Sequence, residues 1–355
     1  MREGSLHRGD IVEVRSSREI LATLDERGAL GAMSFMPEMI PYLGRRFTVS
    51  ARADKICDTI GSTLRSRRMT DTVLLDDLRC DGAAHGGCQA DCRIYWKEAW
   101  LKKVDTLDAP AIAQNAADVA ALRTRIEPNV RTSGEGEGDD VRWKCQVTEA
   151  NRASEPLSNT DPRPYFNELR SGNVGPLKFA KVMTLAAYMQ PLHRLKLLRR
   201  PKGRNDKPPR RPEPLNLQPG EWVRVKSLGE IEETLTTHGS NRGLTFDIEM
   251  VAFCGRLFQV RGRVTRIIEE HTGRMLRFRN ECIKLECVVC SGERSTGRFF
   301  CPRNIYPYWR EAWLTRADAP LSTANLPHRH TAPVNCLRGE AAATQGEASG
   351  SDERI

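Results

Sequence analysis

The stretch from Cys80 to Leu101 reads CDGAAHGGCQADCRIYWKEAWL, and parts of it recur near the end of the 355-residue chain. Three parts of the stretch recur: its beginning as Cys290-Ser-Gly, its middle as Cys301, and its end as YWREAWL at positions 308–314. The stretch combines potential metal ligands with paired aromatic residues, and its recurrence predicts that the chain contains an internal repeat.

The repeat extends far to the amino-terminal side of this stretch. At a constant spacing of 211 positions the following residues match: Gly9/Gly220, Val12/Val223, Val14/Val225, Phe35/Phe246, Glu38/Glu249, Met39/Met250, Gly44/Gly255, Phe47/Phe258 and Val49/Val260. The sequence therefore predicts two tandem copies of one module, at residues 8–104 and 219–315. Each copy has about 97 residues, close to the commonest size of an autonomous domain.

Each copy is predicted to begin with an alternating apolar strand, at 11–14 and 222–225, followed by a helix. The helix start carries a capping box in both copies, Ser16 with Glu19 and Ser227 with Glu230. Gly28 and Gly239 are expected to end these helices in a left-handed conformation.

Further strands are predicted around 46–51 and 257–264, and around 72–78 and 282–289. Trp96 and Trp100 are four positions apart, as are Trp309 and Trp313, so each pair is expected to share one face of a closing helix and to pack in the core. The predicted fold class is α+β, with two tandem copies of a small, partly open β-barrel or curved sheet of SH3-like size, each with two helices.

Three further regions are predicted from composition: a mainly helical middle region (105–193), a basic, Pro-rich linker (194–218) and a disordered tail (316–355). The segment from Arg194 to Arg211 contains nine Lys or Arg residues and one Asp, so it carries eight of the nine net positive charges of the chain. The basic character is therefore local to this segment.

Hydrophobic content of 39% and charged content of 28% are ordinary for globular protein. No run of about 18 apolar residues occurs, and residues 1–10 lack the apolar core of a signal peptide. We therefore expect a cytoplasmic protein whose eleven cysteines serve as metal ligands or thiols rather than disulfides.

The first copy holds a cluster of soft ligands: Cys57, Cys80, His85, Cys88 and Cys92. Sulfur and imidazole ligands suit a tetrahedral zinc site, and Gly86-Gly87 would let the backbone fold closely around the ion. An iron-sulfur cluster is the alternative cofactor, and buried free thiols are the alternative without a metal.

Other cysteines are also candidate metal ligands. Cys145 is a further candidate, either to complete the first site or as a nucleophile. In the second copy Cys80 and Cys88 recur as Cys290 and Cys301, whereas Ile268 and Ile305 replace Cys57 and Cys92. A metal site in that copy would need Cys282 or Cys287 as well.

The apolar stretch from Leu177 to Met189 precedes the basic segment. Such an arrangement is typical of a helix that lies on an anionic membrane surface, and the basic segment could instead bind the phosphates of a nucleic acid. A core helix followed by a solvated linker is the third interpretation.

No nucleotide-binding loop, dinucleotide fingerprint, HExxH motif, nucleophile elbow or kinase signature occurs in the sequence. We therefore expect an intracellular tandem-repeat binding or scaffold protein with a structural, Cys-ligated metal site and an unidentified protein partner. The alternative is a metal-dependent tailoring or redox enzyme, using zinc or iron-sulfur, with its site between the first module and the middle region.

Overall fold

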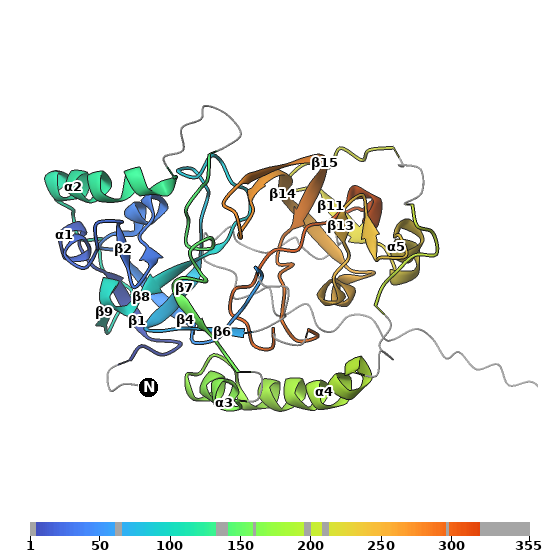
Figure 1. Cartoon of the computed structure of the whole chain (residues 1–355), viewed down its shortest axis with the longest axis horizontal. Coiled ribbons are helices and arrows are strands. Elements are labelled where there is room, and N and C mark those ends of the chain that lie inside the picture. The colour runs from blue at the N-terminus through green and yellow to red at the C-terminus, as the bar shows by residue number, and fades with distance from the viewer. Residues whose placement is uncertain are drawn as a thin grey trace, which may run out of the picture.

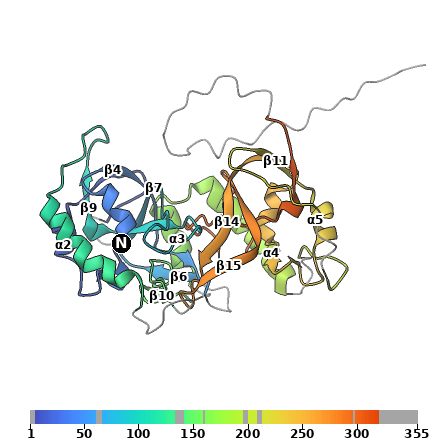
Figure 2. The same ribbon diagram turned by 90° about the horizontal axis from the view of Figure 1, so that it is seen from above.

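The computed structural model of the chain describes residues 5–60, 66–132, 141–158, 161–194, 200–207, 213–295 and 298–319. They form a mixed α+β structure with one main antiparallel sheet in the N-terminal half (residues 5–132) and another in the C-terminal half (residues 213–319). Figures 1 and 2 show the two sheets side by side, with helices around them.

The main sheet of the N-terminal half has five strands in the order β8-β7-β4-β1-β9. These strands are β1 (Ile11–Val14), β4 (Arg46–Arg52), β7 (Thr72–Arg79), β8 (Arg93–Lys97) and β9 (Leu101–Val104). Short elements connect them: α1 (Ser17–Leu21), β2 (Ala29–Leu30), β3 (Met33–Ser34), η1 (Pro37–Tyr42), β5 (Ile56–Cys57), β6 (Ser66–Met69) and η2 (Glu98–Trp100).

The main sheet of the C-terminal half has four strands in the order β15-β14-β11-β16. These strands are β11 (Trp222–Val225), β14 (Leu257–Ile268), β15 (Met275–Leu285) and β16 (Leu314–Arg316). The connecting elements are α5 (Leu228–Thr234), β12 (Ser240–Asn241), β13 (Leu244–Thr245), η4 (Ile248–Phe253) and η5 (Glu311–Trp313).

The two sheets use matching strand registers. Val12 of β1 lies opposite Phe47 of β4, and Val223 of β11 lies opposite Phe258 of β14. Both pairs follow the spacing of 211 positions in the sequence. The residues that repeat in the sequence therefore occupy equivalent places in the two sheets.

The helix that follows the first strand begins as predicted in both halves. Ser16 caps α1 and Ser227 caps α5, and each serine forms the complete capping box with the glutamate three residues later. The predicted helix end is wrong, because α1 already ends at Leu21. Gly28 has a φ of +68°, but it lies in the turn that leads into β2.

The predicted closing helix is also wrong. Trp96 lies in β8 and Trp100 in η2, a single 3-10 turn that leads directly into β9. Each tryptophan packs its ring edge-on against Phe35, at centroid distances of 6.3 and 5.2 Å. Burial on a sheet therefore determines the conformation here, although the four-residue spacing fits a helix.

The tryptophans are core residues, as predicted. Trp96, Trp100, Trp309 and Trp313 are all fully buried. The indole Nε1 of Trp100 donates a hydrogen bond to Thr23 Oγ1 at 3.1 Å, and Trp313 makes the same bond to Thr234 at 2.9 Å. The paired aromatic residues thus anchor the core of each half.

Among the described residues between the two main sheets are three α-helices: α2 (Ala116–Ile126), α3 (Arg163–Arg170) and α4 (Pro176–Arg194). Asn115 caps α2, which buries Leu122 and Ile126 in the core of the N-terminal half. The segment also contains η3 (Glu127–Val130) and β10 (Ser154–Pro156), and β10 pairs with β6. Figure 1 shows α3 and α4 along one side of the molecule, beneath both sheets.

The two halves contact each other reciprocally. The backbone N–H of Ile268 donates to Cys88 Sγ at 3.3 Å, and the backbone N–H of Cys57 donates to Cys301 Sγ at 3.2 Å. Thr59 and Glu270, which are themselves 211 positions apart, bond to each other through their side chains. Each half therefore extends a segment onto the cysteine loop of the other half.

Part of the predicted basic linker lies against the C-terminal half. Gly203 N–H donates to Thr236 O, and Thr237 N–H donates to Asn205 O, both at 2.9 Å. The remainder of the most basic stretch, at 195–199 and 208–212, is outside the described residues, as are residues 320–355 of the predicted tail.

Candidate metal centre

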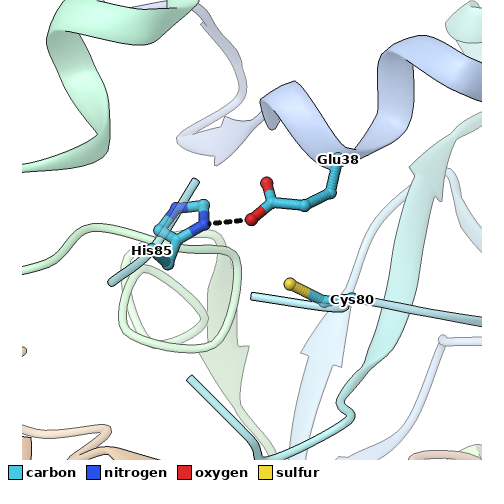
Figure 3. A group of neighbouring side chains, drawn as sticks. All are labelled: Glu38, Cys80 and His85. Carbon is cyan, nitrogen blue, oxygen red and sulfur yellow. Dashed lines mark hydrogen bonds and ion pairs between the residues drawn. The ribbon is translucent and has the colours of Figure 1, made fainter. Parts of the chain in front are cut away.

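Three potential metal ligands converge in the N-terminal half: Glu38 of η1, and Cys80 and His85 of the loop between β7 and β8. Their ligand atoms all lie within 4.8 Å of one another. Figure 3 shows the carboxylate and the imidazole directed at each other, with the thiol beside them. Cys80 and His85 were predicted site residues, whereas Glu38 was recognised only as part of the repeat.

Tight turns shape the loop that carries Cys80 and His85. Gly82 has a φ of +70°, and its carbonyl accepts hydrogen bonds from His85 N–H and Gly87 N–H at 3.0 and 2.9 Å. A Cβ atom on Gly82 would lie 2.1 Å from Cys88 O. This position therefore requires glycine both for its backbone conformation and for the close approach of the chain.

The imidazole of His85 is held by both ring nitrogens. Nδ1 lies 2.7 Å from Glu38 Oε1, and Nε2 lies 3.0 Å from the carbonyl oxygen of Lys144. Metal-binding histidines commonly donate the N–H of the other ring nitrogen to a backbone carbonyl, which fixes the tautomer. With Nε2–H donating to Lys144 O, Nδ1 becomes the atom that would bind a metal.

The carboxylate of Glu38 is buried, with 3% of its side chain exposed. Burial raises the pKa of Glu38, but the hydrogen bond and charge of His85 outweigh burial, so the pKa is lowered overall. Oε1 lies 2.7 Å from His85 Nδ1 and accepts a hydrogen bond from Ala84 N–H. Oε2 is buried without a hydrogen-bond partner among the described residues, as expected of an oxygen that holds an ion.

Two other thiols influence the pKa of Cys80. Burial, reinforced by the charges of Glu38, Cys92 and Cys145, raises the pKa of Cys80. Burial likewise raises the pKa of Cys145 to about 11, with a contribution from Cys88. Neither Cys92 nor Cys145 belongs to the group whose ligand atoms lie within 4.8 Å of one another, so Glu38, Cys80 and His85 are the converging set among the described residues.

The other predicted ligands have different neighbours. Cys88 lies in the same loop, but its sulfur accepts a hydrogen bond from Ile268 of the C-terminal half. Cys57 lies in β5, where its backbone N–H donates to Cys301. The structure therefore brings Cys80 and His85 together with Glu38, and it places Cys57 at the contact between the halves.

The C-terminal half provides an internal comparison for Glu38. Its counterpart Glu249 is also buried, but its two carboxylate oxygens accept from Ser291 Oγ at 2.9 Å and from Arg294 N–H at 2.8 Å. In the sequence, Ser295 lies close to the position that corresponds to His85. Glu249, which accepts from a serine hydroxyl and a backbone amide instead of lying against a histidine, thus has partners for both oxygens, whereas Glu38 Oε2 has none among the described residues.

The duplicated glutamates beside the tryptophans have a structural role. Glu98 pairs with Arg52 and accepts from Leu6 N–H. Glu311 pairs with Arg263 and accepts from Leu217 N–H. Each carboxylate therefore links the segment before the first strand of its half to the 3-10 turn before the last strand.

Comparisons of the chain with protein-family models, with curated proteins and with solved structures find no match. Among the described residues, no helix is both long enough and apolar enough to cross a bilayer. The geometry of the Glu38, Cys80 and His85 group is therefore the main guide to function.

Proposed function

We propose that this chain is an intracellular, non-catalytic binding protein built from two tandem modules, with a structural zinc ion at Glu38, Cys80 and His85. The observation that carries the proposal is the convergence of the three ligand atoms within 4.8 Å of one another. A carboxylate, a thiolate and an imidazole form a ligand set that zinc accepts in proteins. Two observations support the proposal. Lys144 O orients the His85 ring, and Glu38 Oε2 has no hydrogen-bond partner among the described residues.

Burial favours a structural ion over a catalytic one. A catalytic zinc keeps one coordination position open to substrate, whereas a structural zinc is enclosed by protein ligands. The side chains of Glu38 and His85 are only 3% and 1% exposed, and Cys80 beside them is partly buried. The zinc would link η1, the loop after β7 and, through the His85 bond, Lys144.

Elemental analysis of the purified, chelator-free protein tests this proposal. We expect about one tightly held zinc per chain and no colour. A brown protein that contains iron and acid-labile sulfide would instead support the competing redox enzyme. Protein that is folded but holds neither metal would contradict both.

An exposed apolar face on α3 and α4 is the best candidate for the binding surface. We define it by Phe166, Leu177, Met183 and Tyr188, which are 60%, 87%, 36% and 67% exposed. The opposite side of α4 buries Val182 and Ala186 against a cluster that includes Phe299 and Phe300. Helix α4 is thus already anchored to the protein on one side, and its apolar residues on the other side remain available.

We propose an anionic membrane surface as the partner of this α3–α4 apolar face. Lys181 is exposed on the same helix, as is Lys178, which pairs with Glu293. The basic segment from Arg194 to Arg211 begins at the last residue of α4. Apolar side chains next to clustered Lys and Arg suit the interface of a bilayer that contains anionic lipid.

Sedimentation with vesicles of phosphatidylserine and phosphatidylcholine tests this surface. We expect the intact chain to bind them in a salt-sensitive manner, and Leu177→Asp to weaken binding by about tenfold or more, because inserting one leucine contributes roughly 1.5–3 kcal/mol. Leu107→Asp, which changes another exposed leucine (45% exposed), should leave binding unchanged. Binding to duplex DNA but not to the vesicles would assign the basic segment to nucleic acid and contradict the membrane proposal.

A further inference from the structure

A pair of thiols lies at the contact between the two halves. Cys57 belongs to β5 of the N-terminal half, and Cys301 belongs to the loop between β15 and η5 of the C-terminal half. Cys57 N–H donates to Cys301 Sγ at 3.2 Å, although the two residues are 244 positions apart. Both are free cysteines with buried side chains, 4% and 7% exposed.

Cationic groups surround this pair. Lys55 is buried beside it and donates to Phe299 O, and Arg303 donates to Cys57 O at 3.4 Å. The positive charges of Arg303 and Arg298 act on the Cys57 thiol. Such an environment stabilises a thiolate and disfavours a bound metal cation.

The two thiols differ in character. The hydrogen bond with Cys301, together with Arg303 and Arg298, lowers the pKa of Cys57 despite its burial. Burial, with the neighbouring Cys57, raises the pKa of Cys301. In disulfide chemistry this asymmetry separates an attacking thiolate from a resolving thiol that reacts second.

The reciprocal contact on the other side of the interface does not contain two thiols. There the N–H donor is Ile268, and the acceptor is Cys88 Sγ. The backbone contact is therefore the same in both directions, but the Cys57 side adds a second sulfur. Packing of the interface alone does not require that sulfur, since an isoleucine satisfies the equivalent position.

We propose that Cys57 and Cys301 are a redox modification site, at which hydrogen peroxide, an oxidant small enough to enter a buried contact, oxidises the pair to a disulfide that links the two halves. The Cys57 thiolate attacks one oxygen of the peroxide, which gives a sulfenic acid on Cys57 and releases hydroxide. The Cys301 thiol then attacks the Cys57 sulfur, and the sulfenic oxygen leaves as water. Two cysteine thiols are oxidised to one disulfide, and one peroxide is reduced to two water molecules, which take up the two thiol protons.

Peptide mapping of the oxidised full-length chain tests the proposal. Trypsin releases Cys57 in ICDTIGSTLR (56–65) and Cys301 in FFCPR (299–303). After treatment with hydrogen peroxide and alkylation of the remaining thiols, we expect these two peptides to be joined by a disulfide that dithiothreitol cleaves. The joined form should raise the thermal midpoint of the chain, because the cross-link closes a long loop of the unfolded chain.

Matched variants make the result decisive. Cys57→Ala and Cys301→Ala should each abolish the joined peptide, whereas Cys254→Ser, which changes a partly buried cysteine of η4's C-cap, should retain it. Circular dichroism of each variant shows whether it folds. Recovery of both peptides alkylated, of Cys57 oxidised to sulfinic acid without cross-linking, or of Cys57 joined to a different cysteine would overturn the proposal. The outcome does not depend on zinc, so it is separate from the test of the proposed function.

Discussion

Cys80→Ser is expected to remove the bound zinc and to lower the free energy of unfolding by more than about 4 kcal/mol, because loss of a structural metal is among the most destabilising changes. The substitution replaces a soft sulfur ligand by a hydroxyl, which binds zinc poorly, and leaves Glu38 and His85 facing each other. Zinc content by elemental analysis and urea unfolding of the purified variant measure the two effects.

The C-terminal half supplies the control for this substitution. Cys290 occupies the corresponding place beside Glu249 and is also largely buried, and its burial raises the pKa of the thiol to about 12. Cys290→Ser removes a thiol in the same setting but should leave the zinc content unchanged. If Cys80→Ser retained a full equivalent of zinc, or if Cys290→Ser lost it, the assignment to Glu38, Cys80 and His85 would fail.

Trp100→Ala is expected to lower the free energy of unfolding by about 3–5 kcal/mol, the range for removing a large aromatic side chain from a packed core. The substitution deletes the edge-on contact with Phe35 and leaves the Thr23 hydroxyl without its indole donor. Trp313→Ala should have a similar effect in the C-terminal half, where Phe246 and Thr234 make the same contacts. Urea unfolding gives the magnitudes.

Trp100→Phe separates the contribution of packing against Phe35 from that of the hydrogen bond to Thr23. Phenylalanine keeps an aromatic ring against Phe35 but cannot donate to Thr23, so we expect a smaller loss: about 1 kcal/mol from the hydrogen bond and an additional cost from the smaller ring. Equal destabilisation by Trp100→Phe and Trp100→Ala would show that packing against Phe35 contributes little.

The local sequence predicted much of each sheet. The alternating strands at 11–14 and 222–225 and the two capping boxes are present as expected, because they depend on neighbouring residues. The segment that contains Trp96 and Trp100 is predicted as a closing helix, but it forms β8 and η2. Its aromatic spacing fits both a helix and a buried strand that ends in a 3-10 turn, and only pairing with β7 distinguishes them.

The candidate site was predicted in part. Cys80 and His85 were recognisable because metal-binding residue types cluster beside glycines. Glu38 was visible only as a repeated glutamate, since no sequence signal placed it next to a loop more than 40 positions away. The neighbours of Cys57 could not be predicted from the adjacent sequence, because that residue contacts the other half of the chain.

The reciprocal contact between the halves has a consequence for their origin. The N-terminal half carries the amide of Cys57 and the sulfur of Cys88, and the C-terminal half carries the amide of Ile268 and the sulfur of Cys301. Each half therefore supplies the donor of one contact and the acceptor of the other. A surface of this kind is self-complementary and corresponds to the isologous interface of a twofold homodimer, here joined within a single polypeptide.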